Sequence, residues 1–271
     1  MIAQMHRLDA LSNNLANVDL NGYKRDIAVH KSFPALLLRR MNDDGVYIFP
    51  FGSVDTTPII GKLGTGVELN EVYTIFTQGS LKQTDNPFDI ALEGEGFLSV
   101  QTPSGEKYTR NGSFLLNNDG YLVNKNGESV LGEEGPVKLK KNNFIIDQDG
   151  VIYQNRNFEG DDLRLVSLEE NEWENIERVD RLKLVDFKRT RYLKKSGNSL
   201  WQSTEESGSG IIIDERSRPK VRQGFIESAN VNPVTEMVKI IEVHRSYEAN
   251  QRLIQSEDQL SASLINNAVK V

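Results

Sequence analysis

The most restrictive feature of the sequence is a long helical pattern at its C-terminal end. Asn232 is placed as an N-cap, Pro233 suits the first helical position, and Glu236 falls in the first turn. A helix of about forty residues is about 60 Å long, which is longer than most globular cores can cover. We therefore expect its apolar stripe to be buried by a second helix and by other subunits. The stripe comprises Met237, Ile240, Ile241, Val243, Tyr247, Leu253, Ile254, Leu260, Leu264 and Ile265.

A second, shorter helical pattern begins at Ile2. Its apolar residues recur three or four positions apart and form one stripe. Asn21-Gly22 supplies the left-handed residue that commonly closes a helix, so the chain should leave in an extended path. We expect the two terminal helices to pair as a coiled-coil stalk. The stripe of the shorter helix comprises Met5, Leu8, Leu11, Leu15 and Val18.

Between the helices, the sequence changes to short alternating strands separated by turns. Strands such as VELNEVYTIF and GFLSVQ fall within residues 67–200, and Asn126-Gly127 is one of several turn signals. Residues 203–220 are predicted to form a loop that returns the chain to the C-terminal helix. The predicted fold class is α+β, with a mostly antiparallel central β domain inserted between the helices. Its predicted divisions are an N-terminal helical segment at 1–30, an extended connector at 31–66, the β domain at 67–220 and the C-terminal helical segment at 221–271.

Composition excludes several classes of function. The net charge is −7 and the basic residues are scattered among acidic ones, so we expect no nucleic acid as a partner. The chain contains no cysteine, which excludes a disulfide framework, a thiolate nucleophile and a zinc-thiolate site. No apolar run is long enough to span a bilayer, so no membrane insertion is expected. The N-terminus lacks the basic start, apolar core and cleavage site of a secretory signal.

Candidate catalytic and ligand-binding motifs have simpler explanations. Glu93 and Glu95 lie beside glycines at a strand end, and the DQDG segment at 147–150 lacks the later Glu of a calcium loop. His244 has no second histidine four residues away, so we interpret it as an interface residue and not a metal ligand. The basic run at 188–197 is interpreted as a solvated face or as one electrostatic contact between subunits. We therefore expect no enzyme activity, no metal and no cofactor.

Three segments resemble one protein family. LSNNLANVDLNGYKRD, residues 11–26, resembles the N-terminal signature of the flagellar rod and hook family, although Leu20 replaces the usual Thr or small polar residue. QGFIESANVNPVTEMVKIIEVHRSYEANQRLI resembles the C-terminal helix of that family. The segment from TQGSLKQTDNPFDIALEGEGFLSVQ to VLGEEGPV is similar to its central β domain. The three segments occur in the family's order and cover most of the chain.

The resemblance implies a tubular, axial structure. Terminal helices of such proteins form an inner coiled-coil tube that lines the export channel, and the β domain forms the outer wall. The implied partners are homologous rod and hook-family subunits, self-association through the terminal helices, and the flagellar type III export apparatus. The implied location is the periplasmic rod of the basal body, reached without a cleaved signal peptide. Length and the central segment favour the proximal rod member, with the distal rod member as the alternative. A periplasmic β-domain enzyme or carbohydrate binder, with helices that only dimerise, is the other alternative.

The asparagines near the N-terminus require a separate explanation, because asparagine is a poor helix former. An asparagine amide offers both a donor and an acceptor to backbone groups that apolar side chains cannot satisfy. We expect these amides to bond across helix ends and between subunits, with Asn14 and Asn17 the most costly to lose. Ordinary capping and fraying of a helix is the alternative. The predicted subunit interface comprises Met5, Leu8, Leu11, Asn13, Asn14, Leu15, Asn17, Asn21, Gly22, Asn230, Asn232, Met237, Ile241, His244, Tyr247, Asn250 and Ile254.

Overall fold

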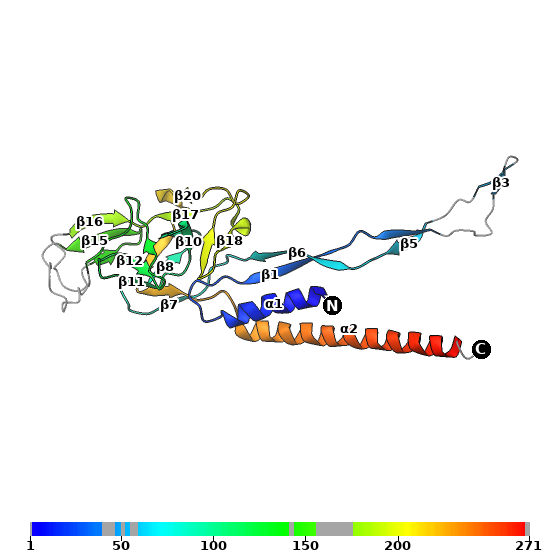
Figure 1. Cartoon of the computed structure of the whole chain (residues 1–271). Coiled ribbons are helices and arrows are strands. Elements are labelled where there is room, and N and C mark those ends of the chain that lie inside the picture. Colours follow the sequence, from blue (N-terminus) through cyan, green and yellow to red (C-terminus); the bar gives the residue numbers. More distant parts are fainter. Residues whose placement is uncertain are drawn as a thin grey trace. The chain divides into compact units, whose positions relative to one another are not determined.

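A computed structural model shows the fold and describes residues 2–39, 47–49, 52–54, 59–140, 144–155 and 176–268 (Figure 1). The chain forms two compact units. The helix-and-ribbon unit consists of the first helix as far as Ser12, residues 27–73, and the C-terminal helix from Val238 onward. The β body consists of residues 13–26 and 74–237. Each unit is therefore assembled from segments that are far apart in the sequence.

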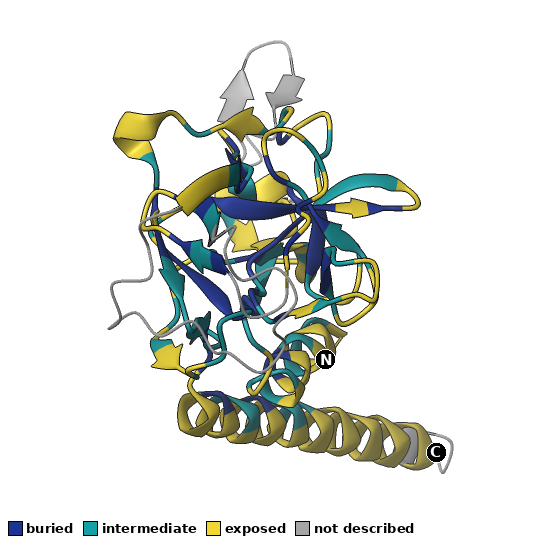
Figure 2. Cartoon of the chain, turned by 90° about the vertical axis from the view of Figure 1, so that its left-hand side faces the viewer, coloured by how far each residue is buried: buried dark blue, intermediate teal, exposed yellow. Residues whose placement is uncertain are grey.

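Both predicted terminal helices are present. Helix α1 spans Ile2–Ala16, and α2 spans Pro233–Ala268. Asn232 caps α2 as predicted, because its side-chain oxygen accepts the N–H groups of Val234 and Thr235 at 3.1 and 3.2 Å. With 36 residues, α2 is about 54 Å long. Every residue from 251 to 266 is exposed, as the yellow helix in Figure 2 shows.

A two-stranded ribbon occupies most of the region predicted to be an extended connector. Strand β1 pairs with β6, β2 with β5, and β3 with β4 (Figure 1). The described residues of that region form paired strands, and the sequence analysis missed this pairing. The bounds are β1 (Asp26–Ser32), β2 (Leu36–Arg39), β3 (Tyr47–Phe49), β4 (Gly52–Val54), β5 (Ile59–Leu63) and β6 (Val67–Thr74).

The β body contains one large sheet and several smaller ones. The large sheet has nine strands, with the order β11-β12-β13-β9-β10-β19-β18, and β17 joins it by pairing with both β9 and β20. Its strand pairings are antiparallel, as predicted. Its strands are β9 (Phe97–Thr102), β10 (Gly105–Thr109), β11 (Phe114–Leu116), β12 (Leu122–Asn124), β13 (Ser129–Val130), β17 (Leu184–Asp186), β18 (Lys194–Lys195), β19 (Leu200–Gln202) and β20 (Ile211–Ile212).

The described part of the β body also contains a three-stranded antiparallel sheet and two strand pairs. The three-stranded sheet has the order β14-β15-β16. The strand pairs join the C-terminal return to the start of the body, because β21 pairs with β8 and β22 pairs with β7. These strands are β7 (Leu81–Gln83), β8 (Ile90–Glu93), β14 (Phe144–Ile146), β15 (Val151–Asn155), β16 (Ile176–Arg181), β21 (Lys220–Gln223) and β22 (Phe225–Glu227). In the described part of the body, short 3-10 helices lie at Thr190–Tyr192 and Glu215–Ser217.

The hydrophobic core lies inside the β body (Figure 2). Its larger cluster draws on most strands of the body, from Ile90 in β8 to Val221 in β21. A smaller, aromatic cluster contains Phe97, Tyr108 and Trp201 with Phe76 packed against it. These aromatic rings are therefore core residues and do not form an exposed platform for a ligand.

Candidate functional site

The segments that leave α1 and enter α2 meet inside the β body. We call this region the terminal junction and define it as residues 13–26, 74–79 and 227–232 together with Arg110, which packs against Gly22 and Glu227. The N–H of Gly22 donates to the carbonyl of Glu227 at 2.7 Å, and the N–H of Ile75 donates to the carbonyl of Arg25 at 2.9 Å. The N–H of Asn230 donates to the carbonyl of Tyr23 at 3.3 Å. Backbone hydrogen bonds thus tie three distant stretches of sequence together.

Asn14 holds the chain as it leaves α1. Only 1% of its surface is exposed. Its amide nitrogen donates to the carbonyl of Asp26 at 2.8 Å, and its amide oxygen accepts the N–H of the same residue at 2.8 Å. The hydroxyl of Tyr23 also donates to this oxygen, at 3.2 Å. Asn14 therefore pairs with the backbone of Asp26 as a neighbouring strand would, and its hydrogen bonds are satisfied within the chain.

Asn230, near the start of α2, also holds the segment that leaves α1. Its side-chain oxygen accepts the N–H of Arg25 at 2.8 Å. Its amide nitrogen donates to the carbonyls of Ile75 at 2.8 Å and Thr77 at 3.1 Å. One amide thus bridges the N-terminal segment and the start of the β body.

Gly22 allows the backbones to approach closely. Its φ is +66°, a left-handed conformation that favours glycine. A Cβ atom at this position would lie 2.4 Å from the backbone carbon of Arg110, which is far inside van der Waals contact. The sequence analysis predicted that Gly22 closes the helix, and the structure adds a steric requirement for glycine.

Three charged side chains are buried together at the centre of the junction. Lys24, Arg110 and Glu227 are 0%, 4% and 1% exposed. The ammonium of Lys24 lies 2.5 Å from Glu227 Oε1 and donates to the carbonyl of Thr77 at 2.8 Å. Glu227 Oε1 also accepts the N–H of Gly79 at 2.8 Å. Buried charges require such partners, because transfer out of water is costly.

The charges of this cluster do not balance. Arg110 Nη1 is 3.7 Å from Glu227 Oε2, and Arg110 Nη2 donates to the carbonyl of Gly94 at 2.6 Å. Two cations therefore share one carboxylate. Burial lowers the pKa of Lys24, and the negative charge of Glu227 opposes this effect. Burial likewise lowers the pKa of Arg110, again opposed by Glu227. Glu227 thus stabilises the charged forms of both Lys24 and Arg110 in the interior.

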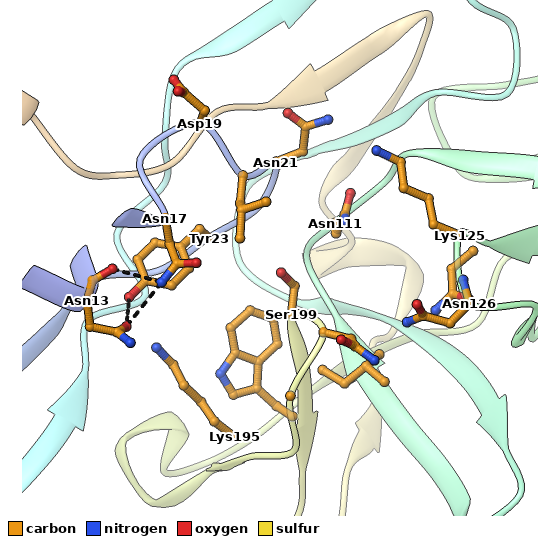
Figure 3. A pocket seen from close by; sticks show the side chains of 16 residues that line it. Asn13, Asn17, Asp19, Asn21, Tyr23, Asn111, Lys125, Asn126, Lys195 and Ser199 are labelled. Atoms are coloured by element: carbon orange, nitrogen blue, oxygen red, sulfur yellow. Dashed lines mark hydrogen bonds between the residues drawn. The ribbon is translucent and has the colours of Figure 1, made fainter. Parts of the chain in front are cut away.

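The other N-terminal asparagines line a pocket of about 490 Å³ in the β body (Figure 3). Asn13 Oδ1 accepts the hydroxyl of Tyr23 at 2.8 Å, and the amide nitrogen of Asn17 donates to the carbonyl of Asn13 at 2.8 Å. These bonds lie at the end of α1, and by themselves they also fit the alternative of ordinary helix capping. Bonds between subunits stay a prediction. The pocket is lined by Asn13, Asn17, Asp19, Leu20, Asn21, Tyr23, Asn111, Asn124, Lys125, Asn126, Lys195, Gly197, Asn198, Ser199, Leu200 and Trp201.

The remaining predicted interface residues are distributed between the two units. The β body holds Leu15, Asn232 and Met237. It also holds the residues that the structure brings together at the terminal junction, which are Asn13, Asn14, Asn17, Asn21, Gly22 and Asn230. In the helix-and-ribbon unit, Leu11 is buried and Leu8, Tyr247 and Asn250 are half-buried. The exposed residues of that unit are Met5, Ile241, His244 and Ile254.

Sequence reasoning missed the buried charges. Lys24 and Glu227 are 203 positions apart, and nothing in the local pattern of either residue indicates that it is buried. The only local signal was the position of Lys24 directly after the Asn-Gly-Tyr turn. Among the described residues, no group of acidic or histidine side chains is arranged to hold a metal ion. No helix in the described part of the chain is both long enough and apolar enough to cross a membrane.

Three regions of the chain match models of known protein families. Residues 1–24 match the family model described as "Flagella basal body rod protein". Residues 91–154 match "Flagellar hook protein FlgE/F/G D1 domain", and residues 222–267 match "Flagellar basal body rod FlgEFG protein C-terminal". The flagellar basal-body rod protein FlgG of Buchnera aphidicola subsp. Schizaphis graminum is 34% identical over 97% of this chain and 94% of its own. The chain belongs to the flagellar basal-body rod protein family.

Two further relatives agree with this assignment. The flagellar hook-basal body complex protein FlhO of Bacillus subtilis is 31% identical over 100% of this chain and 96% of its own. The flagellar basal-body rod protein FlgF of Caulobacter vibrioides is 28% identical over 97% of this chain and 92% of its own. As a rod family protein, the chain is a structural component of the flagellar basal body and not an enzyme. Its family membership makes homologous rod and hook subunits its assembly partners.

The buried charges connect the three regions that define the rod family. Lys24 lies in the N-terminal match, Arg110 in the central match and Glu227 in the C-terminal match. The terminal junction is therefore the place where all three matched regions of a rod protein are joined.

Proposed function

We propose that the chain is an axial subunit that polymerises into the hollow rod. In this proposal, α1 and α2 pair as a coiled-coil stalk and form the inner tube around the export channel, and the β body forms the outer wall. The chain reaches the periplasmic rod through the flagellar type III apparatus, without a cleaved signal peptide. The predicted interface residues on both helices serve as subunit contacts, and the two helical segments act as one discontinuous helical domain.

The exposed apolar stripe of α2 is the observation that carries this proposal. Leu253, Leu260 and Leu264 are 63%, 64% and 70% exposed. They follow one another at intervals of seven and four residues, so they lie on one face of the helix. Full burial of a leucine side chain is worth about 1.5–3 kcal/mol, which folding of the single chain does not recover here. Assembly with neighbouring subunits would recover it.

The ribbon offers a second uncovered apolar surface. Leu36, Leu37 and Leu38 of β2 are about half exposed, and Ile59 and Leu63 of the paired strand β5 are exposed as well. Successive residues of a strand point to opposite faces, so consecutive leucines make both faces of the ribbon apolar. Exposed apolar surface of this extent is typical of an interaction site.

The position of the chain along the rod is either proximal or distal. Sequence analysis favours the proximal member, FlgF, and keeps the distal member, FlgG, as the alternative. Relatives named FlgG align at up to 34% identity, compared with 28% for the relative named FlgF, which supports the alternative. Electron microscopy of isolated basal bodies with an antibody against the β body decides between them. Label at the membrane end supports the proximal position, and label at the hook end supports the distal one.

The assembly role is tested by removing the stripe in the native host. A strain lacking the gene is complemented with the wild-type chain or with Leu253→Gln/Leu260→Gln/Leu264→Gln, which keeps good helix formers at exposed positions. We expect the variant to be made at normal levels but to be absent from purified basal bodies, with loss of motility. The matched control is Gln251→Ala/Gln259→Ala on the same exposed part of α2, which should be incorporated normally. Normal incorporation of the leucine variant would show that the stripe is not an assembly surface.

A further inference from the structure

The pocket beside the terminal junction has an unusual lining. The chain leaving α1, the turn at 124–126 and the turn at 196–199 surround it (Figure 3). Its charged side chains are Asp19, Lys125 and Lys195, and Lys195 is already 2.8 Å from Asp26. The chemistry of the pocket is therefore mainly that of neutral amides. These are Asn13, Asn17, Asn21, Asn111, Asn124, Asn126 and Asn198.

A buried donor in the lining has no partner. Trp201 is 1% exposed, and its indole Nε1 has no hydrogen-bond partner. A buried polar group that lacks a hydrogen bond costs stability, and such groups are rare in folded proteins. The Trp201 ring packs edge-on against Phe76 and Phe97, so its faces are not free to stack on a ligand. Only the indole N–H is left to bind one.

The turn next to Trp201 is held in an unfavourable conformation. Gly197, Asn198 and Ser199 have consecutive φ values of 78°, 51° and 59°. Residues other than glycine rarely adopt this left-handed region, and strain of this kind tends to occur at binding sites. The turn places Asn198 and Ser199 in the lining of the pocket.

The terminal junction itself shows what an asparagine amide binds in this protein. Asn14 pairs with both the N–H and the carbonyl of Asp26, and Asn230 accepts from Arg25 while it donates to Ile75. In both cases, the amide acts as a substitute for a neighbouring strand and holds extended main chain. In the pocket, the side chains of Asn13, Asn17, Asn111 and Asn124 already make hydrogen bonds within the chain, whereas the amides of Asn21, Asn126 and Asn198 make none to the described residues.

We propose that this pocket binds an extended main-chain segment of a second copy of the chain. The amides of Asn21, Asn126 and Asn198 and the indole N–H of Trp201 would then pair with the peptide groups of that segment. The occupant is a second copy because the family assembles from homologous subunits, and because a nearly neutral, amide-lined pocket suits peptide groups better than a phosphate or another strongly charged ligand. This inference rests on the proposed function, since it requires the chain to polymerise.

Cross-linking tests the inference directly, because the chain contains no cysteine. Asn126→Cys places a single thiol in the pocket, and Asn118→Cys places one in an exposed turn that is not part of the lining. Both full-length proteins are labelled with a benzophenone maleimide and irradiated as monomers and as polymers. We expect the Asn126 label to give a cross-link between two chains in the polymer alone, on one contiguous peptide. The Asn118 label should give no such product.

A side-chain variant supplies the energetic test. Asn21→Ala/Asn198→Gly removes two amides from the pocket, and glycine at 198 keeps the left-handed turn without strain. We expect the concentration needed for polymerisation to rise at least tenfold, while the thermal unfolding of the monomer changes no more than it does for Asn118→Ala. Trp201 fluorescence is measured in chains that carry Trp173→Phe. It should change on polymerisation when Asn21 and Asn198 are present, and it should not change when Asn21→Ala/Asn198→Gly is added.

The outcomes separate the two proposals. A wild-type chain that never polymerises overturns the proposed function, and the pocket inference with it. A wild-type chain that polymerises, with no pocket cross-link and an unchanged polymerisation threshold for Asn21→Ala/Asn198→Gly, overturns the pocket inference alone.

Discussion

Glu227 is the single side chain on which the terminal junction depends most. It faces both Lys24 and Arg110, and it also accepts the N–H of Gly79. The three side chains are at most 4% exposed, so solvent screens their charges little, and Glu227 is the carboxylate that lies against both cations. Lys24 lies in the N-terminal family match and Glu227 in the C-terminal one, so this ion pair joins the two ends of the chain.

Neutralising Glu227 should therefore destabilise the fold strongly. We expect Glu227→Gln to lower the free energy of unfolding by about 3–5 kcal/mol, because it leaves buried cations without a counter-charge. Urea unfolding measures this change. The control is Glu93→Gln, whose ion pair with Arg222 is more than 40% exposed at both side chains and should contribute at most about 1 kcal/mol. Equal losses for the two variants would show that burial of the cluster has no energetic consequence.

A second prediction concerns the close contact between Gly22 and the backbone of Arg110. Gly22→Ala adds a Cβ atom against the backbone of Arg110 in addition to a left-handed strain, so we expect a loss of about 2–5 kcal/mol. Gly127→Ala is a matched control, because Gly127 has a φ of +82° and no atom within 4 Å of the added Cβ. The control should lose only about 1–2 kcal/mol. Chemical denaturation compares the two, and similar losses would contradict the close approach at Gly22.

Tyr23 gives the junction a dependence on alkaline pH. Burial, and then the charge of Asp26, raise the pKa of Tyr23 above its ordinary value of 10.0. Above pH 10, the unfolded chain therefore loses a proton that the folded chain keeps. The stabilising effect of this shift is complete below pH 10 and decreases as pH rises further. Tyr23→Phe cannot show this loss.

Stability measured between pH 9 and 11 isolates the effect. We expect the wild-type chain to lose up to about 1.4 kcal/mol more than Tyr23→Phe by pH 11. Lys24 acts with the opposite sign, because its lowered pKa makes stability rise with pH below its ordinary value. That contribution is present in both proteins and cancels in the difference. Parallel pH profiles for the two proteins would contradict a buried, protonated Tyr23.

Individual residues also show what the sequence can and cannot predict about the site. Asn14 and Gly22 were identified because an asparagine in a helix and an Asn-Gly turn are locally unusual. Lys24, Arg110 and Glu227 were missed because a charged residue is normally exposed, and only the fold brings these three together. Long-range pairing leaves no trace in the local pattern of a single sequence.

At the scale of secondary-structure elements, α2 was predictable because its signals are local. The cap at Asn232, the proline at 233 and the spacing of apolar residues all lie within the helix itself. The ribbon was not predictable to the same degree. Its glycines and prolines indicated extended backbone, but the pairing of β2 with β5 depends on residues at least twenty positions apart.

The cap of α2 makes a prediction at this scale. Asn232→Ala removes the acceptor for two N–H groups of the first turn, so we expect a loss of about 1 kcal/mol in the free energy of unfolding. Gln259→Ala, at an exposed position in the same helix, should change stability by less than about 0.5 kcal/mol. Thermal unfolding followed by circular dichroism measures both. An unchanged stability for Asn232→Ala would mean that α2 does not depend on its N-terminal cap.

At the scale of the whole molecule, burial is unevenly distributed. The β body has a continuous core, whereas the distal half of α2 and much of the ribbon expose large apolar residues. The single chain therefore keeps a folded core and leaves large apolar side chains exposed. Self-association through that surface is the central claim, and it concerns the full-length chain.

Sedimentation velocity over a concentration series tests this claim most directly. For the wild-type chain, we expect the average mass to rise from the 30.6 kDa monomer without reaching a plateau, as open-ended association requires. The Leu253→Gln/Leu260→Gln/Leu264→Gln variant should remain a monomer throughout the series. A closed dimer of constant mass in both proteins would contradict an axial subunit and would favour a protein whose helices serve only to dimerise.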